Sequence, residues 1–175
     1  MLTYLEQWRS TGPQSELGQR MGRGLNENLA RELLELHLLG VDGGYDQTDV
    51  RELAELLTGL VYHSRRGFYY DPRMAEPGTE QVLGVTFGAE ATLSNILVAL
   101  DTLAMHPETA HHLAQKMAVH FIGADPDPAM VAKMAQSYLN TGGNLMAMTV
   151  SMLRSDSAWV PEKTKVRLPM EFMMA

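Results

Sequence analysis

Leucine residues recur at helical spacing between residues 27 and 39 and predict the first long element of the chain. On a helical wheel they fall on two opposite sides, which are formed by Leu29, Leu33 and Leu36 and by Leu34 and Leu38. Asn26 is placed to cap this helix, and Gly40 ends the pattern. Because a helix that is apolar on two sides usually packs on both, we place residues 27–39 at the centre of the domain.

Similar patterns predict further helices along the chain. A single apolar stripe predicts a helix over residues 48–61, and another helix begins near Leu93. The pairs His106-Pro107 and Asp127-Pro128 open two more, since proline fits the first turn of a helix. Asn144 is placed to cap a short helix that follows them.

Residues 62–90 interrupt the helical pattern. They contain the aromatic run Phe68-Tyr69-Tyr70 and two proline interruptions, Pro72 and Pro77. These signals predict a long loop or a short hairpin at about 62–90. The predicted fold class is therefore mainly α, an irregular multi-helix domain with a central helix at about 27–39.

The length of 175 residues corresponds to about one domain. We divide it into an N-terminal lead-in segment, residues 1–23, and a single helical domain, residues 24–175. The chain ends soon after Leu168-Pro169 opens another helix, so we expect a fragment of a longer protein. Apolar side chains at that end, or the Leu34 and Leu38 side of the central helix, would then be exposed and favour self-association.

Charge and composition exclude several classes of function. Lys and Arg number 14 and Asp and Glu number 21, which gives a net charge of 14 − 21 = −7. The chain therefore lacks the basic surface of a general nucleic-acid binder. No apolar run is long enough for a membrane span, and the first ten residues do not resemble a signal peptide. The absence of cysteine excludes disulfides, zinc fingers and a thiol nucleophile.

A polar block on the central helix is the candidate site. Asn28, Arg31 and Glu35 fall within about 60° of one another on the wheel, and Glu32 is adjacent. We favour a buried ionic network, in which Arg31 pairs with Glu35 or Glu32 and fixes helix packing. The alternative is a carboxylate pair, Glu32 and Glu35, that acts as acid and base beside Arg31. Asn26 and Asn28 would then contact a ligand.

His37 lies at the margin of the main stripe, and we expect a hydrogen-bonded core histidine, although it is also a candidate catalytic residue. The Glu-x-x-His spacing of carboxylate-bridged metal sites is absent, because Leu34 stands three residues before His37. Asp42, Asp46 and Asp49 lack the spacing of a calcium loop, so we expect them to form turns and cap helices. We predict no metal and no cofactor, since the chain has neither a phosphate loop nor a nucleophile elbow.

Several segments, found in the same order, carry a resemblance to a known family. The strongest is residues 26–37, with the sequence NENLARELLELH, which residues 39–45 and Asp49-Val50 follow. The later segments are Glu76-Pro77-Gly78 with residues 82–84, residues 106–110 and residues 165–172. Together they resemble the bacterial domain-of-unknown-function family numbered 1800, from about residue 24 to the end of the chain.

The resemblance implies a mostly helical, exported protein of greater length, whose N-terminal half is absent from this sequence. Members are often encoded beside a protein of the unknown-function family numbered 1501. No activity is established for the family, so the resemblance implies none. The chain departs from the family pattern at two positions: Leu60 replaces a usual Trp after Thr58-Gly59, and Ala75 replaces a usual His before Glu76. If that His served chemistry in relatives, this chain has lost it.

Two hypotheses about function follow. In the first, the chain is a non-catalytic helical binding or assembly module of an exported protein, because no catalytic set is assembled in the sequence. In the second, it is part of a hydrolase whose Glu32, Glu35 and Arg31 site is completed by the missing N-terminal half. That half and a protein of the family numbered 1501 are the expected partners. Burial distinguishes the hypotheses, since a catalytic carboxylate lines an open cleft and a structural one is enclosed and paired.

Overall fold

The computed structural model describes residues 1–22, 24–88, 92–159 and 173. The chain forms two compact units, Met1–Leu103 and Ala104–Ala175. Residues 1–22 belong to the first unit, where Leu5 joins the hydrophobic core. The boundary between the units therefore falls after Leu103, and it does not coincide with the predicted division at residue 23.

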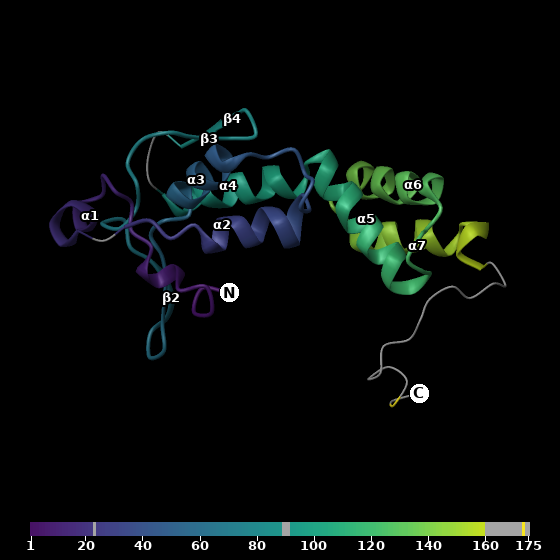
Figure 1. The fold of residues 1–175 in the computed structure, drawn as a ribbon, viewed down its shortest axis with the longest axis horizontal. Helices are drawn as coiled ribbons and strands as arrows, with labels where there is room; N and C mark the ends of the chain where they lie inside the picture. Colours follow the sequence, from purple (N-terminus) through teal and green to yellow (C-terminus); the bar gives the residue numbers. More distant parts are fainter. Residues whose placement is uncertain (23, 89–91, 160–172, 174–175) are drawn as a thin grey trace. The chain divides into compact units, whose positions relative to one another are not determined.

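Helices predominate in the first unit, which also contains two small hairpins (Figure 1). Its helical segments are η1 (Gln7–Arg9), α1 (Glu16–Met21), α2 (Asn28–Glu32) with its continuation η2 (Leu33–Leu38), α3 (Gln47–Leu56) and α4 (Leu93–Ala104). The two antiparallel hairpins are formed by β1 (Leu60–His63) with β2 (Gly67–Tyr70), and by β3 (Glu80–Val82) with β4 (Val85–Phe87). The prediction of a mainly α fold is confirmed.

The predicted central helix is present, but its second half is a π-helix. Together α2 and η2 cover residues 28–38, close to the predicted 27–39. The N–H of Leu39 donates to the carbonyl of Leu34, five residues earlier, at 2.8 Å, so one face recurs at a longer spacing than in an α-helix. Both of these leucines are buried, whereas Leu36 is 46% exposed. The predicted stripe through Leu36 is therefore wrong, because the wheel assumed an α-helical repeat.

The Leu34 and Leu38 side of this helix faces the core. Leu34 is fully buried, and Leu38 is half-buried against the same cluster. This side is thus packed within the first unit and does not provide the exposed surface that we predicted for self-association. The other predicted surface, the helix that opens at Leu168, lies outside the described residues.

A capping box fixes the start of α3. The Asp46 carboxylate accepts from the N–H groups of Thr48 and Asp49 at 2.7 and 3.0 Å, and the Asp49 carboxylate accepts from the N–H of Asp46. All members of the predicted stripe are buried: Val50, Leu53, Ala54, Leu57 and Leu60. The helix ends at Leu56, earlier than predicted, because the chain turns into β1 at Gly59, whose φ is +86°.

The core of the first unit joins its long helices to the second hairpin. α3 packs against both α2 and β3. The fully buried large side chains here include Leu34, Val50, Leu53, Leu57, Val82 and Ile96. On α4, Ile96 fills the core, while its neighbour Leu97 is 53% exposed.

The second unit is a set of helices with a different core. It contains α5 (Pro107–Phe121), α6 (Pro128–Asn140), α7 (Leu145–Leu153) and η3 (Asp156–Trp159), and α6 packs against both α5 and α7. Its buried side chains are mainly alanines and methionines, among them Ala110, Ala114, Ala118, Met130, Met134, Met148 and Met152. The predicted starts of α5, α6 and α7 and the predicted Asn144 cap are confirmed, and His106, Asp127 and Asn144 each accept from the N–H two residues later.

The described part of the chain contains no helix that combines the length and the apolar character needed to cross a membrane.

Candidate functional site

An open groove of about 400 Å³ lies between the N-terminal turn and α2. Residues 4–6 line one side, and Asn28, Arg31 and Glu32 line the other. This volume is within the range of small-molecule sites. Three of the six residues proposed from the sequence therefore line a single groove, which we call the α2 groove.

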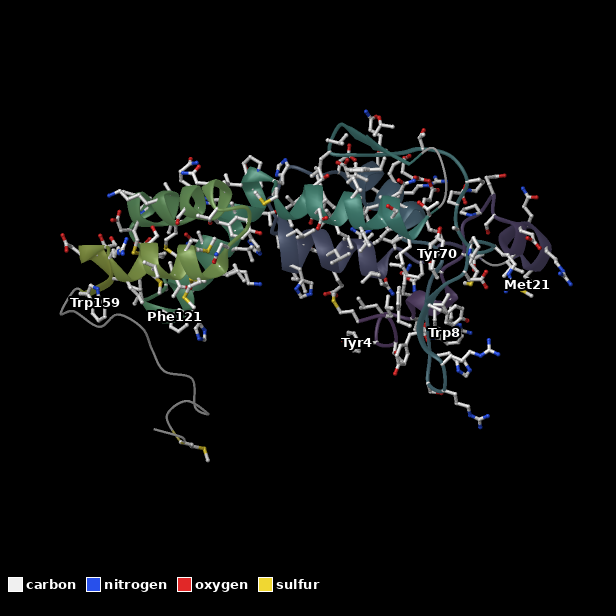
Figure 2. The ribbon with its side chains drawn as sticks, turned by 180° about the vertical axis from the view of Figure 1, so that it is seen from behind. Tyr4, Trp8, Met21, Tyr70, Phe121 and Trp159 are labelled. Carbon is white, nitrogen blue, oxygen red and sulfur yellow. The ribbon has the colours of Figure 1, made fainter. Side chains whose placement is uncertain are left out.

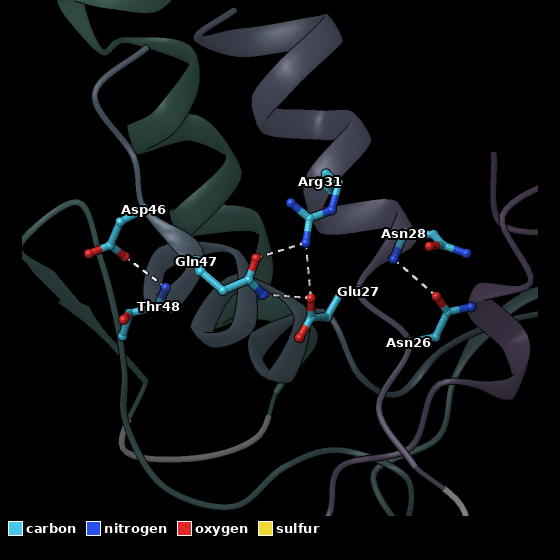
Figure 3. Close-up of polar contacts among 7 residues, drawn as sticks. All are labelled: Asn26, Glu27, Asn28, Arg31, Asp46, Gln47 and Thr48. Atoms are coloured by element: carbon cyan, nitrogen blue, oxygen red, sulfur yellow. Dashed lines mark hydrogen bonds and ion pairs between the residues drawn. The ribbon is translucent and has the colours of Figure 1, made fainter. Parts of the chain in front are cut away.

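Asn26 positions this groove and does not line it. Its side-chain amide donates to the carbonyl of Leu5 at 2.9 Å, and its Oδ1 accepts from the N–H of Asn28 at 3.0 Å (Figure 3). Its backbone N–H also donates to Ser10 Oγ at 3.0 Å. Asn26 thus joins the N-terminal turn to the first turn of α2, and its role as a ligand contact stays a prediction.

Arg31 belongs to a surface network and not to a buried one. Its Nη2 donates to Glu27 Oε2 at 3.2 Å and to Gln47 Oε1 at 2.9 Å, while Gln47 Nε2 donates to the same Glu27 oxygen at 2.8 Å (Figure 3). The side chains of Arg31 and Glu27 are 44% and 33% exposed. The predicted core pair of Arg31 with Glu35 or Glu32 is wrong, because Gln47 at the start of α3 draws the guanidinium toward the preceding turn.

The structure separates the proposed acid–base pair. Glu32 is half-buried, lines the α2 groove and has no hydrogen bond or ion pair with another described residue. Glu35 does not line the groove; it lies near Tyr45, where its charge adds to burial in raising the pKa of the phenol. His37 is exposed, so the expected core histidine is wrong as well.

The backbone is irregular on both sides of the α2 groove. Glu6, which lines it, has φ +53° and ψ 28°, in the left-handed region that a non-glycine residue adopts at a cost of about 1–2 kcal/mol. The π-helix begins directly after Glu32. Strained backbone and π-helical turns are both enriched at functional sites, so they add to the case for this groove.

A second surface, which the sequence patterns did not identify, is formed by the β1–β2 hairpin. Tyr62 and Phe68 stand opposite each other in its register and are 44% and 51% exposed. Tyr69, the partner of Val61, is exposed on the opposite face of the hairpin, and Arg65 and Arg66 at the tip are exposed without an ion pair to any described residue. We call these five residues the hairpin surface.

One face of the β1–β2 hairpin is apolar, and the core covers only the part of this face that is far from the tip. Leu60 and Tyr70 are also opposite partners, and they share a face with Tyr62 and Phe68. Leu60 is buried, whereas the aromatic pair toward the tip is not. η1 packs beside β1 and adds Trp8, which is 39% exposed (Figure 2). The aromatic run was visible in the sequence, but its exposure depends on how far the hairpin reaches past the core.

The two motifs at which the chain departs from the family pattern meet inside the first unit. The N–H of Glu76 donates to Thr58 Oγ1 at 2.7 Å, and the Thr58 hydroxyl donates to the carbonyl of Glu55 at 2.6 Å. The variant positions Leu60 and Ala75 are both buried. Residues 58–60 and 75–76 therefore form a packed junction in this chain, with Glu76 also accepting from the N–H of Gln14 at 2.9 Å.

Glu80 is a buried acid next to this junction. Burial raises its pKa from 4.5 to about 7, and the charges of Glu52 and Glu55 add to the shift. It lines a cavity of about 10 Å³ with Tyr70, Glu76 and other side chains. That space suits one water molecule at most, so we interpret Glu80 as part of the packing of β3 and not as a substrate site.

The aspartates that suggested calcium have other roles. Asp46 and Asp49 form the capping box of α3, and Asp49 also accepts from the N–H of Leu83 at 2.7 Å. Over residues 1–22, 24–88 and 92–159, no three His, Asp or Glu side chains are grouped so that they could hold a metal ion.

Comparison with known proteins gave one match. A family model described as a protein of unknown function (DUF1800) matches residues 1–175, which includes the N-terminal stretch that the sequence motifs left out. No curated protein and no solved structure matched the chain.

Proposed function

We propose that this chain, which belongs to the DUF1800 family of proteins of unknown function, is a non-catalytic binding or assembly module that docks on a partner protein. The observation that carries the proposal is the hairpin surface. It combines an exposed cross-strand pair, Tyr62 and Phe68, with two exposed arginines at the tip. Aromatic side chains and arginine are the residue types most enriched at the energetic centres of protein interfaces.

The charge of the chain indicates which kind of partner fits. The net charge is −7, yet Arg65 and Arg66 lie together at the hairpin tip without a carboxylate partner among the described residues. A partner with an acidic patch would pair with these arginines, while its apolar centre would cover the aromatic side chains. The family resemblance makes a protein of the unknown-function family numbered 1501 the first candidate.

Calorimetric titration of the chain with the protein of family 1501 encoded beside it tests this proposal. We expect saturable binding that Phe68→Ala weakens by about tenfold or more, as at an interface hot spot. The double charge reversal Arg65→Glu with Arg66→Glu should weaken binding and reduce its dependence on salt. Arg20→Glu, an exposed charge reversal on α1, is the matched control and should bind as the parent does.

Two results would contradict the proposal. Absence of binding would reject this partner, and binding that tolerates every hairpin variant would reject the surface. Circular dichroism spectra of each variant establish that the fold is retained.

A hydrolase is the second candidate function, and the position of Glu32 favours it. Glu32 lies in an open groove beside Arg31, which is the placement expected of a catalytic carboxylate. Because Glu35 lies elsewhere, a second catalytic group would have to come from outside the described residues. The full-length protein should then turn over ester, peptide or glycoside substrates, and Glu32→Gln should abolish turnover while Glu27→Gln retains it. That is the outcome if the chain belongs to a hydrolase. Because we favour the docking function, we expect to find no turnover that depends on Glu32.

We also propose that the full-length protein is exported, on the basis of the family resemblance. An immunoblot of fractionated cells tests this: a signal in the periplasmic or extracellular fraction supports export, and a signal confined to the cytoplasmic fraction rejects it.

A further inference from the structure

A second groove of about 400 Å³ lies in the second unit, between α6 and α7. Lys133 and Ser137 line it from α6, and Ser151, Arg154 and Ser155 line it from the end of α7 and the turn that follows. The spacing of four residues on α6 and of three and four residues after Ser151 places each set on one helical face. The α6–α7 groove therefore brings together two cations and three hydroxyl groups that lie far apart in the sequence.

No carboxylate of the residues that the structure describes lines the α6–α7 groove. Lys133 and Arg154 are exposed, and neither forms an ion pair with any residue that the structure describes. The charge of Lys133 does act on one acid, Asp127. The pKa of Asp127 is lowered mainly by the hydrogen bond from Ser157, and Lys133 is the smallest of the causes. Asp127 already accepts from Ser157 Oγ at 2.7 Å and from the N–H of Ala129 at 3.0 Å. Among the described residues, no carboxylate therefore pairs with the positive charge in the groove, although the chain as a whole is acidic.

The hydroxyl groups differ in what they can donate. Ser137 donates its proton to the carbonyl of Ala147 at 3.2 Å. The hydroxyls of Ser151 and Ser155 have no hydrogen-bond partner among the described residues, so both protons are free for a ligand. The groove thus presents an ammonium group, a planar guanidinium group and two free hydroxyl donors, together with short apolar side chains of α7.

We infer that the α6–α7 groove is a binding site for the tetrahedral oxyanion of a small phosphate or sulfate ester. A guanidinium group matches two oxygens of such an anion, and an ammonium group and hydroxyls match the others. The volume leaves room for a small organic group beyond the oxyanion, which the apolar side chains would contact. This site is separate from the hairpin surface and does not depend on the proposed docking function.

The experiment is a titration of the ¹⁵N-labelled chain followed by NMR, with inorganic phosphate, sulfate and phenyl phosphate at constant ionic strength. We expect saturable shifts of the amides of Ser151 and Ser155, and tighter binding of phenyl phosphate than of inorganic phosphate. Lys133→Met and Arg154→Met should each weaken binding by about tenfold or more, since each removes a charge-assisted hydrogen bond. The matched controls are Lys116→Met on α5 and Arg20→Met on α1, which should bind as the parent does.

Several outcomes would overturn the inference. Amide shifts at lysines and arginines all over the chain would show only a general attraction of anions. The same conclusion would follow if Lys133→Met bound phosphate as tightly as the parent does. If phenol, titrated in the same way, bound as tightly as phenyl phosphate, the groove would be an apolar site and not an oxyanion site. Phosphatidic acid vesicles that bind while inorganic phosphate and phenyl phosphate do not would assign the groove to a lipid surface. The NMR spectrum of each variant also reports whether it has folded.

Discussion

The two units of the chain are built by different means. The first has a core of leucine, valine and isoleucine, its α2 passes into a π-helix, and Glu6 before η1 has a left-handed backbone. The second has a core of alanine and methionine, and α5, α6 and α7 each begin with a capping side chain. Side-chain caps begin α3 of the first unit as well as α5, α6 and α7 of the second, but the π-helix and the left-handed Glu6 belong to the first unit, where tertiary packing holds the irregular backbone.

This difference has a functional side. Both surfaces that support the proposed functions, the α2 groove and the hairpin surface, lie in the irregular unit. Strained or irregular backbone persists only where surrounding packing holds it, and such places are enriched at functional sites. The regular unit instead carries its candidate site on two ordinary helix faces, as in the α6–α7 groove.

The two units can be followed separately, because the sequence has two tryptophans and each unit contains one, Trp8 or Trp159. Trp159→Phe leaves Trp8 as the fluorescent reporter of the first unit, and Trp8→Phe leaves Trp159 as the reporter of the second.

The largest effect is expected at the π-helix. Leu34 is fully buried, so Leu34→Ala should lower the free energy of unfolding of the first unit by about 2–5 kcal/mol. Leu36→Ala, two residues away but 46% exposed, should change it by less than about 0.5 kcal/mol. Urea unfolding followed by Trp8 fluorescence measures both. Equal losses for the two variants would mean that the helix repeats as an α-helix and that the π-turn is absent.

The next effect concerns the buried acid Glu80. Its pKa is about 7 in the folded chain and 4.5 as the ordinary value, so the folded state holds a proton that the unfolded state releases. The first unit should therefore lose about 2–3 kcal/mol of stability as the pH rises from 4.5 to 7, with little further loss above that. Glu80→Gln should remove this loss and be the more stable form at pH above 7.

Unfolding of the first unit by urea across this pH range measures the Glu80 effect. Glu16→Gln, which changes an exposed carboxyl on α1, is the control and should retain the pH dependence of the parent. Superimposed profiles for Glu80→Gln and the parent would show that Glu80 does not hold the extra proton.

Helix caps provide the corresponding test in the second unit. The Asn144 side chain accepts from the N–H groups of Met146 and Ala147 at 2.9 and 3.1 Å, so Asn144→Ala should cost about 1 kcal/mol. Asn144→Asp keeps an acceptor and should cost less. Trp159 fluorescence during urea unfolding measures the loss. If the first unit were destabilised equally, the two units would unfold together and the comparison between them would fail.

The same contrast explains what the sequence could and could not predict. Caps and prolines are local signals, and they placed the starts of α5, α6 and α7 correctly through His106, Asp127 and Asn144. The exposure of Leu36 depends on a π-turn that no local signal marks. The choice of Glu27 over Glu35 as the partner of Arg31 cannot be read from spacing, since both stand four residues away.

The candidate site was predictable to a similar degree. Asn28, Arg31 and Glu32 were proposed from the sequence, and they do line one groove. The other side of that groove comes from residues 4–6, which only the tertiary fold brings to α2. His37 was misplaced because the wheel set it at the margin of the main stripe, where we expected a core histidine, whereas it is exposed within the π-helix.

The smallest effect is expected for Arg31, where the sequence analysis implied a large one. In a buried network, Arg31→Ala would leave unpaired charge in the core and cost about 3–5 kcal/mol. The observed pair with Glu27 is a half-exposed i,i+4 pair, and such pairs contribute about 0.2–1 kcal/mol. The hydrogen bond to Gln47 adds a contact to α3, which is also at the surface. We therefore expect Arg31→Ala to cost less than about 1 kcal/mol, because water replaces the lost partners. A double-mutant cycle of Arg31→Ala with Glu27→Ala, measured at low and high salt, should give a coupling that salt reduces, and a large coupling that is insensitive to salt would restore the buried network.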